Sequence, residues 1–583
     1  MFVKIKKYFK NNSCYVSLLM GILLFTISCS SIEKKPPYEI SESYNVSINR
    51  DFWGIPYIRG KTDQDVAFGI GFAHAEDAYE DLVELMPLYR GENAIYNGLK
   101  SIETDYLVRL LKIHLKVENI AKKQLSKNIL SMAQAYADGV NMYANQHPEK
   151  VNQNLHPVTQ EDIIAGSYIQ HLFFAGLDRD LAQMASQEKQ SIPTGSNAIA
   201  INSIKADSNA SYLLINSHQP LSGPVGWYEL NIESESGWHG HGGNFPGSFL
   251  INVGFNKTMG WGATVNRPDV MDIFELTINP KNEDQYLLDG VWESFQIEED
   301  YLTFKVFGFL KIKTKQKFRY SKFGPVLEMK GKYFAIRHAN ENSFNEIEGW
   351  YEISNTRSVY EFEKQLSKRK IPSFNFVTMD ADRNIGYFYN GRIPYRNDAP
   401  VARQIIKSSS SKDIWDDDNL VSDLPKYINP SNGWLQSTNQ NPFHVMGNYS
   451  LEKKLVHKFV DFEKRLTNRS YVANELLSSN ESIDLNRFIE IKFDNTYSKN
   501  SRQYKYLKSI AQYDQMIQQT IKNWNRKTDF RNTNAGLGMC FMAQEWIAEM
   551  NSKSTPSYES AKKECESIFK TIKRDFSDEW SLI

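Results

Sequence analysis

The sequence has few cysteines and almost no net charge. Its four cysteines, Cys14, Cys29, Cys540 and Cys565, are too few and too scattered for a disulfide scaffold or a structural zinc site. The 68 basic and 69 acidic residues leave a net charge of −1, which gives no reason to expect a nucleic-acid partner. With 41% hydrophobic and 23% charged residues, the composition excludes wholesale disorder and a multi-span membrane protein.

The N-terminal region differs from this even composition. Residues 1–12 contain four lysines and no acidic residue, and residues 15–27 are almost entirely apolar but too few to span a bilayer. This pattern predicts an export signal over residues 1–28. Cys29 follows a small residue, as in bacterial lipoproteins, so we expect a lipidated Cys29, a tether over residues 29–43, and a location at the periplasmic or cell surface. A plain secretory signal or an uncleaved anchor, with no role for Cys29, is the alternative.

A helical part follows the tether. The alternating pattern over residues 44–58, interrupted by Gly54 and Pro56, predicts two short strands around a turn. The apolar residues then change to a helical period, which predicts a helical region ending at residue 185. Its helices are expected over residues 62–88, 104–125, 129–146 and 159–185. The polar segment 186–195 is typical of an exposed linker.

Strand patterns dominate after residue 195. Segments 197–203 and 211–217 flank a stretch of turn composition and predict a β-hairpin. Further strands are expected over residues 248–255, 258–265, 273–277 and 301–320. Residues 469–583 form a charged helical stretch, in which Cys540 and Cys565 could form one disulfide.

The predicted hairpin brings a serine close to a histidine. Antiparallel pairing places Ser196 opposite His218 or the neighbour of His218. Ser196 follows Gly195 at the end of a polar segment, so it does not lie in the Gly-x-Ser-x-Gly turn of a nucleophile elbow. If the chain is cut between Gly195 and Ser196, the new α-amine, with an unperturbed pKa of about 8, can act as the base for the serine hydroxyl. A Gly-Ser pair at the start of a strand is also common without any such role.

Several ordered motifs carry a family resemblance. Segments 195–198 (GSNA) and 216–220 (NSHQP) are flanked by further motifs at residues 50–58, 69–77, 260–265, 324–326, 382–386, 391–396 and 433–442. Together they resemble the penicillin acylase family of N-terminal nucleophile hydrolases, which includes acyl-homoserine lactone acylases and aculeacin acylases. The resemblance implies an α+β fold, a four-layer αββα sandwich wrapped by α-chain helices, with residues 196–583 as the β-chain-like catalytic region. Against the family pattern, the chain is short after residues 576–580.

The resemblance also implies roles for five residues. Ser196 is the nucleophile freed by self-cleavage, and His218 resembles the histidine that orients the new amine. Val265, through its backbone N–H, and Asn439, through its side-chain amide, resemble the oxyanion-hole donors, each typically worth about 3 to 4 kcal/mol. Arg469 resembles an arginine that supports the site. Without the resemblance, His218 would be a strand-end histidine, Val265 a core residue and Arg469 a solvated surface residue.

A structural calcium ion is a further implication of the resemblance. Asp269 and Asp272 stand where some family members have two calcium ligands, and carboxylates with a backbone carbonyl between them suit Ca²⁺. Glu161 is the candidate for a third ligand from the N-terminal part. The ion would tie the two chains together, and no cofactor is expected for catalysis.

The implied function is that of an amidohydrolase acting on linear amides. Its substrate would be an N-acyl homoserine lactone, a lipopeptide or a β-lactam side chain, its two chains would stay associated, and the lipid would be its one membrane contact. Gln219 stands where lactone acylases usually have an aromatic residue, so long-chain acyl specificity does not follow. Two rivals remain: a metal hydrolase using His218, His239 and His241, and a non-catalytic surface lipoprotein that keeps the fold.

Overall fold

The structure is a computed structural model that describes residues 38–575, apart from residues 41, 153–154, 178–180, 182–194, 208, 224, 309, 397–403, 448–459, 461, 464 and 552. The predicted export signal, the lipidation of Cys29, segment 576–580 and nearly all of the predicted linker lie outside the described residues. Among the helices that the structure does describe, none is both long and apolar enough to cross a membrane.

The described chain begins with the predicted strand pair and helix. Strands β1 (Val46–Arg50) and β2 (Pro56–Gly60) pair antiparallel. Helix α3 (Asp63–Tyr89) begins after Thr62, whose side chain accepts a hydrogen bond from the Asp65 N–H, and the Asp65 side chain accepts one from the Thr62 N–H. This capping box explains why the helix starts where the sequence predicts.

Two further long helices pack on α3. Helix α8 (Lys127–Gln146) approaches α3 so closely that a Cβ on Gly71 would lie 2.1 Å from the backbone oxygen of Tyr136. Helix α9 (Gln160–Ala175) contacts both and ends at Gly176, which has φ 105. The glycine in α3 is therefore required by helix packing.

The single helix predicted over residues 104–125 is wrong. Lys112 lies in the left-handed region, with φ 54, and interrupts the helical backbone. The chain forms short pieces instead: α4 (Asn93–Asn97), η2 (Leu99–Ser101), α5 (Ile102–Leu110), α6 (Ile113–Lys116), the π-helical turn η3 (Val117–Ala121) and α7 (Lys122–Gln124). Apolar spacing does not reveal such a break, because the spacing continues across it.

The largest sheet has nine strands in the order β1-β2-β5-β6-β7-β8-β17-β18-β20. The strands after β2 are β5 (Tyr228–Ser234), β6 (His239–Asn244), β7 (Val253–Phe255), β8 (Met259–Thr264), β17 (Asn375–Asp380), β18 (Ile385–Tyr389) and β20 (Lys426–Ile428). All neighbours pair antiparallel except β2 and β5, which are parallel. That parallel pair joins the N-terminal part of the chain to the part after residue 195.

A three-stranded sheet packs face to face on the large sheet. It consists of β21 (Trp434–Ser437), β3 (Gly195–Ile201) and β4 (Tyr212–His218), in that order. Glycines in β8 allow the close approach, because a Cβ on Gly262 would lie 3.0 Å from the Ala198 side chain. Trp261, between Gly260 and Gly262, is fully buried in the core on the helical side.

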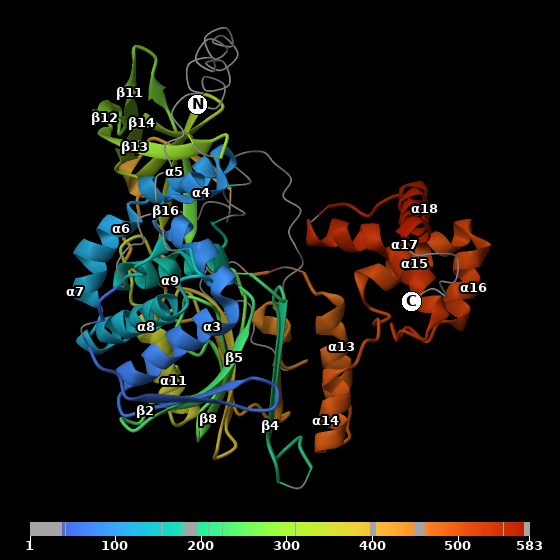
Figure 1. Cartoon of the computed structure of the whole chain (residues 1–583). Helices are drawn as coiled ribbons and strands as arrows, with labels where there is room; N and C mark the ends of the chain where they lie inside the picture. The colour runs from blue at the N-terminus through green and yellow to red at the C-terminus, as the bar shows by residue number, and fades with distance from the viewer. Residues whose placement is uncertain are drawn as a thin grey trace.

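Helices on both outer faces complete four layers (Figure 1). On the large sheet, α3 packs on β1, β2 and β5, and α12 (Val359–Leu366) packs on β17 and β18, with α11 (Glu346–Ser354) beside α12. On the small sheet, α13 (Asn468–Leu477) contacts β21 and α14 (Leu485–Lys492) contacts β4. The expected α+β class is confirmed, and the order of layers is the αββα sandwich.

Two smaller units are attached to this sandwich. One contains a six-stranded and a three-stranded sheet, formed by β13 (Gln296–Val306), β14 (Leu310–Ser321), β15 (Gly324–Met329), β16 (Lys332–His338), β9 (Met271–Leu276) and β19 (Ile405–Ser408), and by β10 (Ile278–Asn279), β11 (Asn282–Leu288) and β12 (Val291–Ser294). The alternating stretch 301–320 is thus two long strands of one hairpin.

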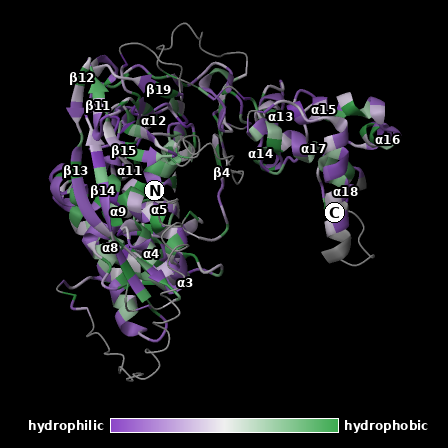
Figure 2. Cartoon of the chain, turned by 90° about the horizontal axis from the view of Figure 1, so that it is seen from above, coloured by the Kyte–Doolittle hydropathy of each residue, from purple (hydrophilic) through white to green (hydrophobic). Residues whose placement is uncertain are grey.

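The other unit is a C-terminal helical cluster with a core of its own. It contains α15 (Arg502–Ile510), α16 (Gln515–Asn523), α17 (Thr533–Met550) and α18 (Tyr558–Asp575). A disulfide joins Cys540 of α17 to Cys565 of α18, as the sequence allowed. In both views the cluster stands beside the sandwich, beyond β4, α13 and α14 (Figures 1 and 2).

Candidate active site

Ser196 lies at the start of β3, the central strand of the small sheet. In the register of β3 and β4, Ser196 pairs with Ser217 and Gly195 pairs with His218. Ser196 was predicted to lie opposite His218 or a neighbour of His218. The prediction is confirmed, because the partner of Ser196 is Ser217. Ser196 is 3% exposed, and its Oγ donates a hydrogen bond to the Gly195 oxygen at 2.7 Å. The hydroxyl therefore lies against the peptide bond that precedes it.

Asn439 binds the backbone nitrogen of Ser196. Its Oδ1 accepts a hydrogen bond from the Ser196 N–H at 2.8 Å, and its Nδ2 donates to the Val265 oxygen at 2.9 Å. Asn439 follows β21 with φ 72, a left-handed conformation that asparagine adopts more readily than most residues. Because Nδ2 carries two hydrogens, one N–H remains for a further acceptor. The structure thus brings Ser196, Val265 and Asn439 together, as predicted.

Arg469, in the first turn of α13, hydrogen-bonds to the same two residues, Ser196 and Asn439. Its Nη1 donates to the Ser196 oxygen at 2.7 Å and to Asn197 Oδ1 at 2.6 Å, and its Nη2 donates to Asn439 Oδ1 at 2.9 Å. These acceptors are neutral, and burial lowers the pKa of the Arg469 guanidinium to about 10. A solvated surface role for Arg469 is therefore wrong.

Gly195 is required by the packing of these side chains. A Cβ at Gly195 would lie 2.7 Å from Arg469 Nη2 and 3.1 Å from Asn439 Oδ1. Both distances are shorter than ordinary van der Waals contact, which begins near 3.4 Å. A side chain at Gly195 would thus displace the groups that hold Ser196.

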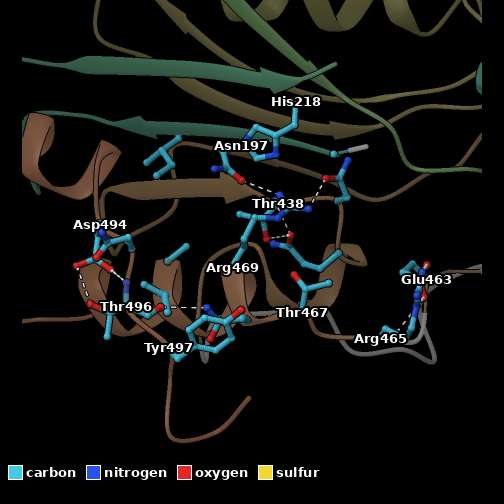
Figure 3. A pocket seen from close by; sticks show the side chains of 18 of the residues that line it. Asn197, His218, Thr438, Glu463, Arg465, Thr467, Arg469, Asp494, Thr496 and Tyr497 are labelled. Carbon is cyan, nitrogen blue, oxygen red and sulfur yellow. Dashed lines mark hydrogen bonds and ion pairs between the residues drawn. The ribbon is translucent and has the colours of Figure 1, made fainter. Parts of the chain in front are cut away.

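His218, at the end of β4, borders the same cavity as Arg469 (Figure 3). Burial, and then the charge of Arg469, lower the pKa of the His218 ring, which favours its neutral form. A neutral ring can accept a proton or a hydrogen bond. The role of His218 in orienting the Ser196 amine stays a prediction.

Val265 lines two cavities. The larger has a volume of about 500 Å³, and its lining includes Gly195, His218, Asn439, Arg469, Tyr497 and Trp546. The smaller has a volume of about 30 Å³, and its lining includes Ser196, Phe174, Trp227, Phe245, Trp350 and Phe374. Val265 borders both, which is where a residue shared by an oxyanion hole and an acyl pocket would lie.

Comparison with known families decides the classification. The family model described as penicillin amidase matches residues 45–579. The chain belongs to the penicillin amidase family. The resemblance to the penicillin acylase family is therefore confirmed. Members of this family need no catalytic cofactor.

Individual relatives of this penicillin amidase family member are distant. The acyl-homoserine lactone acylase PvdQ of Pseudomonas savastanoi pv. phaseolicola is 25% identical over 415 residues, which cover 62% of this chain and 52% of the relative. The acyl-homoserine lactone acylase QuiP of Pseudomonas aeruginosa is 22% identical over 574 residues, which cover 83% of this chain and 65% of the relative. The matches thus span about half to two thirds of the curated relatives. A solved structure of the thermostable penicillin G acylase from Alcaligenes faecalis shares 18% identity, with a TM-score of 0.48 over 59% of this chain and 63% of that one.

In this penicillin amidase family member, the predicted calcium ligands do not fit a calcium site. Arg396 Nε donates to Asp272 Oδ2 at 2.8 Å, and its Nη2 lies 3.5 Å from Asp269 Oδ2. Glu161 instead pairs with Lys122 at 2.6 Å. Within the described ranges, no group of three histidine, cysteine or acidic residues is placed to hold a metal ion. The prediction that Glu161, Asp269 and Asp272 form one ligand set is therefore wrong, because Arg396 already lies beside both aspartates and Glu161 pairs with Lys122.

The three histidines of the rival metal-hydrolase hypothesis lie in two different sheets. The glycine-rich segment that contains His239 and His241 forms β6 of the large sheet, whereas His218 ends a strand of the small sheet. His241 Nε2 lies 3.1 Å from a Glu229 carboxylate oxygen, and His239 Nδ1 bonds to the Gly237 oxygen at 2.7 Å. The three-histidine ligand set is not assembled.

Sequence reasoning missed some residues that hold this site. Asn197 binds Arg469 and could have been found, because it belongs to the same four-residue motif as Ser196. Thr438 Oγ1 donates to Gln440 Oε1 at 2.8 Å and lies 2.8 Å from Ser470 Oγ. These contacts fix the loop that carries Asn439. No spacing in the sequence relates residue 438 to residue 470.

Proposed function

We propose that this protein is an acylase that hydrolyses the amide bond of a small N-acyl compound through an N-terminal serine. The serine is Ser196, released by self-cleavage after Gly195. The observation that carries the proposal is the 2.8 Å hydrogen bond from the Ser196 nitrogen to Asn439 Oδ1, in a loop that also borders the large cavity. Side chains that hold this nitrogen would also hold an α-amine at the same position. The acyl-homoserine lactone acylases among the relatives support the same chemistry.

The position of the Ser196 hydroxyl, against the Gly195 carbonyl, supports self-cleavage. The Oγ attacks the carbonyl carbon of Gly195, the peptide nitrogen leaves as the Ser196 α-amine with a proton, and an ester forms. Water then hydrolyses the ester to give a Gly195 carboxylate and a free serine hydroxyl. Arg469, which donates to the Ser196 oxygen and to Asn439, holds the residue in place during the shift.

Turnover uses the same atoms after the cut. The α-amine accepts the hydroxyl proton as Oγ attacks the amide carbonyl of the substrate. The Val265 N–H and the free N–H of Asn439 Nδ2 donate to the oxyanion. The substrate amine leaves with the proton, and water hydrolyses the acyl-serine. The substrate class is that of an N-acyl homoserine lactone, a lipopeptide or a β-lactam side chain.

Arg469 adds an electrostatic contribution to this mechanism. A cation close to an amine disfavours protonation of that amine and lowers its pKa. Arg469 binds Asn439 Oδ1, the same oxygen that binds the Ser196 nitrogen. The amine is therefore kept in the neutral form that can act as a base near neutral pH.

Mass spectrometry of the purified protein tests the proposal. We expect a fragment that begins at Ser196, and we expect Ser196→Ala to stay as one inactive chain. Ser217→Ala is the matched control for cleavage, because Ser217 is the cross-strand partner of Ser196, and we expect it to be cut. An intact wild-type chain would favour the non-catalytic lipoprotein. Normal cutting of Ser196→Ala would show that another protease makes the cut.

We also propose that the protein is exported and anchored through a lipid on Cys29. The basic and apolar N-terminal segment before Cys29 supports this. Replacement of Cys29 by alanine should move the protein from the membrane fraction to the soluble fraction. Retention of Cys29→Ala in the membrane would favour an uncleaved anchor instead.

A further inference from the structure

The small cavity beside Ser196 limits the size of an acyl group. It borders Ser196 and has a volume of about 30 Å³. One water needs about 10 to 15 Å³ of such space, so the cavity takes about two or three non-hydrogen atoms. An acyl chain of eight or twelve carbons does not fit without rearrangement of the wall.

Five aromatic rings close the cavity. The rings of Trp227 and Phe245 stack with centroids 4.3 Å apart, and Phe174 lies 5.7 Å from Phe245. Phe374 lies 5.5 Å from Phe174 and 5.7 Å from Trp350. Each ring thus contacts its neighbour, so a longer chain would have to separate packed aromatic pairs. Such a close-packed wall resists displacement.

Two residues of this wall each carry a buried polar atom without a hydrogen-bond partner among the described residues. The Trp350 indole N–H donates to His171 Nε2 at 2.9 Å and is satisfied. By contrast, Trp227 Nε1 and Asn252 Oδ1 are buried, and neither has a hydrogen-bond partner among the described residues. Trp227 and Asn252 both line the small cavity. One atom is a donor and the other an acceptor, and a buried polar atom left without a partner is costly.

A hydroxyl group meets both requirements, because one oxygen can accept from a donor and donate to an acceptor. We propose that the acyl half of the substrate is a short hydroxyacyl group whose hydroxyl accepts from Trp227 Nε1 and donates to Asn252 Oδ1. This inference rests on the proposed acylase function. Gln219, which also lines the cavity, adds to its polar character.

Hydrolysis of a panel of amides tests the inference. The panel carries one dipeptide amine with five acyl groups: glycolyl, 3-hydroxypropionyl, butyryl, octanoyl and dodecanoyl. The decisive pair is 3-hydroxypropionyl and butyryl, which have equal numbers of non-hydrogen atoms and differ by a hydroxyl in place of a methyl. We expect kcat/KM for 3-hydroxypropionyl to exceed that for butyryl at least tenfold, and that for dodecanoyl at least a hundredfold.

Substitutions test which residues distinguish the hydroxyl of 3-hydroxypropionyl from the methyl of butyryl. Trp227→Phe removes the indole N–H and keeps a ring, and Asn252→Leu removes the acceptor, so each should bring the ratio of 3-hydroxypropionyl to butyryl kcat/KM towards 1. Trp238→Phe is the matched control, because it also removes a buried indole N–H that has no partner among the described residues, but Trp238 does not line the small cavity, so this variant should keep the wild-type ratio. Cleavage at Ser196 verifies the folding of each variant. The ratio is measured within one variant, so a change in total activity does not affect it.

The outcomes separate this inference from the function on which it rests. A wild-type ratio near 1, a preference for dodecanoyl, or an unchanged ratio in both Trp227→Phe and Asn252→Leu would overturn the inference and leave the acylase function intact. If protein with a verified Ser196 amine hydrolyses none of the five amides, the acylase function fails and the inference fails with it.

Discussion

Replacement of Gly195 by alanine tests the packing around the proposed cleavage site. The new Cβ would lie 2.7 Å from Arg469 Nη2 and 3.1 Å from Asn439 Oδ1, so the guanidinium must move by about 0.7 Å to reach ordinary contact at about 3.4 Å. A movement of that size away from Gly195 would lengthen the bonds of Arg469 to the Ser196 oxygen and to Asn439, which are now 2.7 and 2.9 Å long. The substitution therefore acts on cleavage through Arg469 and Asn439, although it leaves Ser196 in place.

The bonds that would be lost set the expected magnitude. A hydrogen bond to a charged group contributes about 1.5 to 3 kcal/mol, so losing two would raise the barrier by about 3 to 6 kcal/mol and slow cleavage roughly 10²- to 10⁴-fold. The assay is the time course of appearance of the fragment that begins at Ser196, by intact-mass spectrometry, with circular dichroism to verify folding. Cleavage of folded Gly195→Ala within about threefold of the wild-type rate would refute the reasoning.

Three further predictions concern the rest of the molecule. Arg396→Met removes the guanidinium that lies beside the buried Asp269 and Asp272, which should cost about 3 to 5 kcal/mol. Millimolar Ca²⁺ should then raise the Tm of the variant and not of the wild type; equal responses would contradict this. Glu346 is buried and both its carboxylate oxygens lack a partner among the described residues, and burial raises its pKa to about 8. Because the pKa of Glu346 is higher in the folded than in the unfolded state, the free energy of unfolding falls as the pH rises from about 4.5 to about 8. Glu346→Gln should therefore raise Tm more at pH 8 than at pH 5. An equal rise in Tm at both pH values would refute this. The disulfide joins Cys540 to Cys565, which are 25 residues apart. Replacement of both cysteines by serine should destabilise the C-terminal helical cluster by about 3 kcal/mol in thermal unfolding and leave cleavage at Ser196 unchanged.

Local patterns predicted the fold where local rules apply. The start of helix α3 and the β3–β4 hairpin depend on residues close in sequence, and both were predicted. The break at Lys112 was missed, because a positive φ at a lysine has no apolar signature. Strand β6 (His239–Asn244) forms despite its glycines, and its backbone lies close to the neighbouring strand: a Cβ on Gly242 would lie 2.1 Å from the Val253 oxygen.

In the candidate site, too, the features set by local sequence were predicted and those set by distant contacts were not. Family motifs identified Ser196, Asn439 and Arg469, and the hairpin register alone placed Ser196 near His218. The calcium prediction failed because Arg396, more than a hundred residues away in sequence, binds Asp272. Charge pairing of that kind depends on how distant elements pack.

The parallel pairing of β2 with β5 has a consequence for the lifetime of the cut protein. After a cut before Ser196, β1 and β2 belong to one polypeptide and the other seven strands of the large sheet belong to another. The uncut chain refolds in a first-order reaction, whereas the two fragments must find each other, so their refolding becomes second order and slows on dilution. A cut molecule that unfolds therefore refolds poorly, so its lifetime depends mainly on how slowly it unfolds. After the cut, the stability of the protein is kinetic, whereas the uncut chain can refold reversibly.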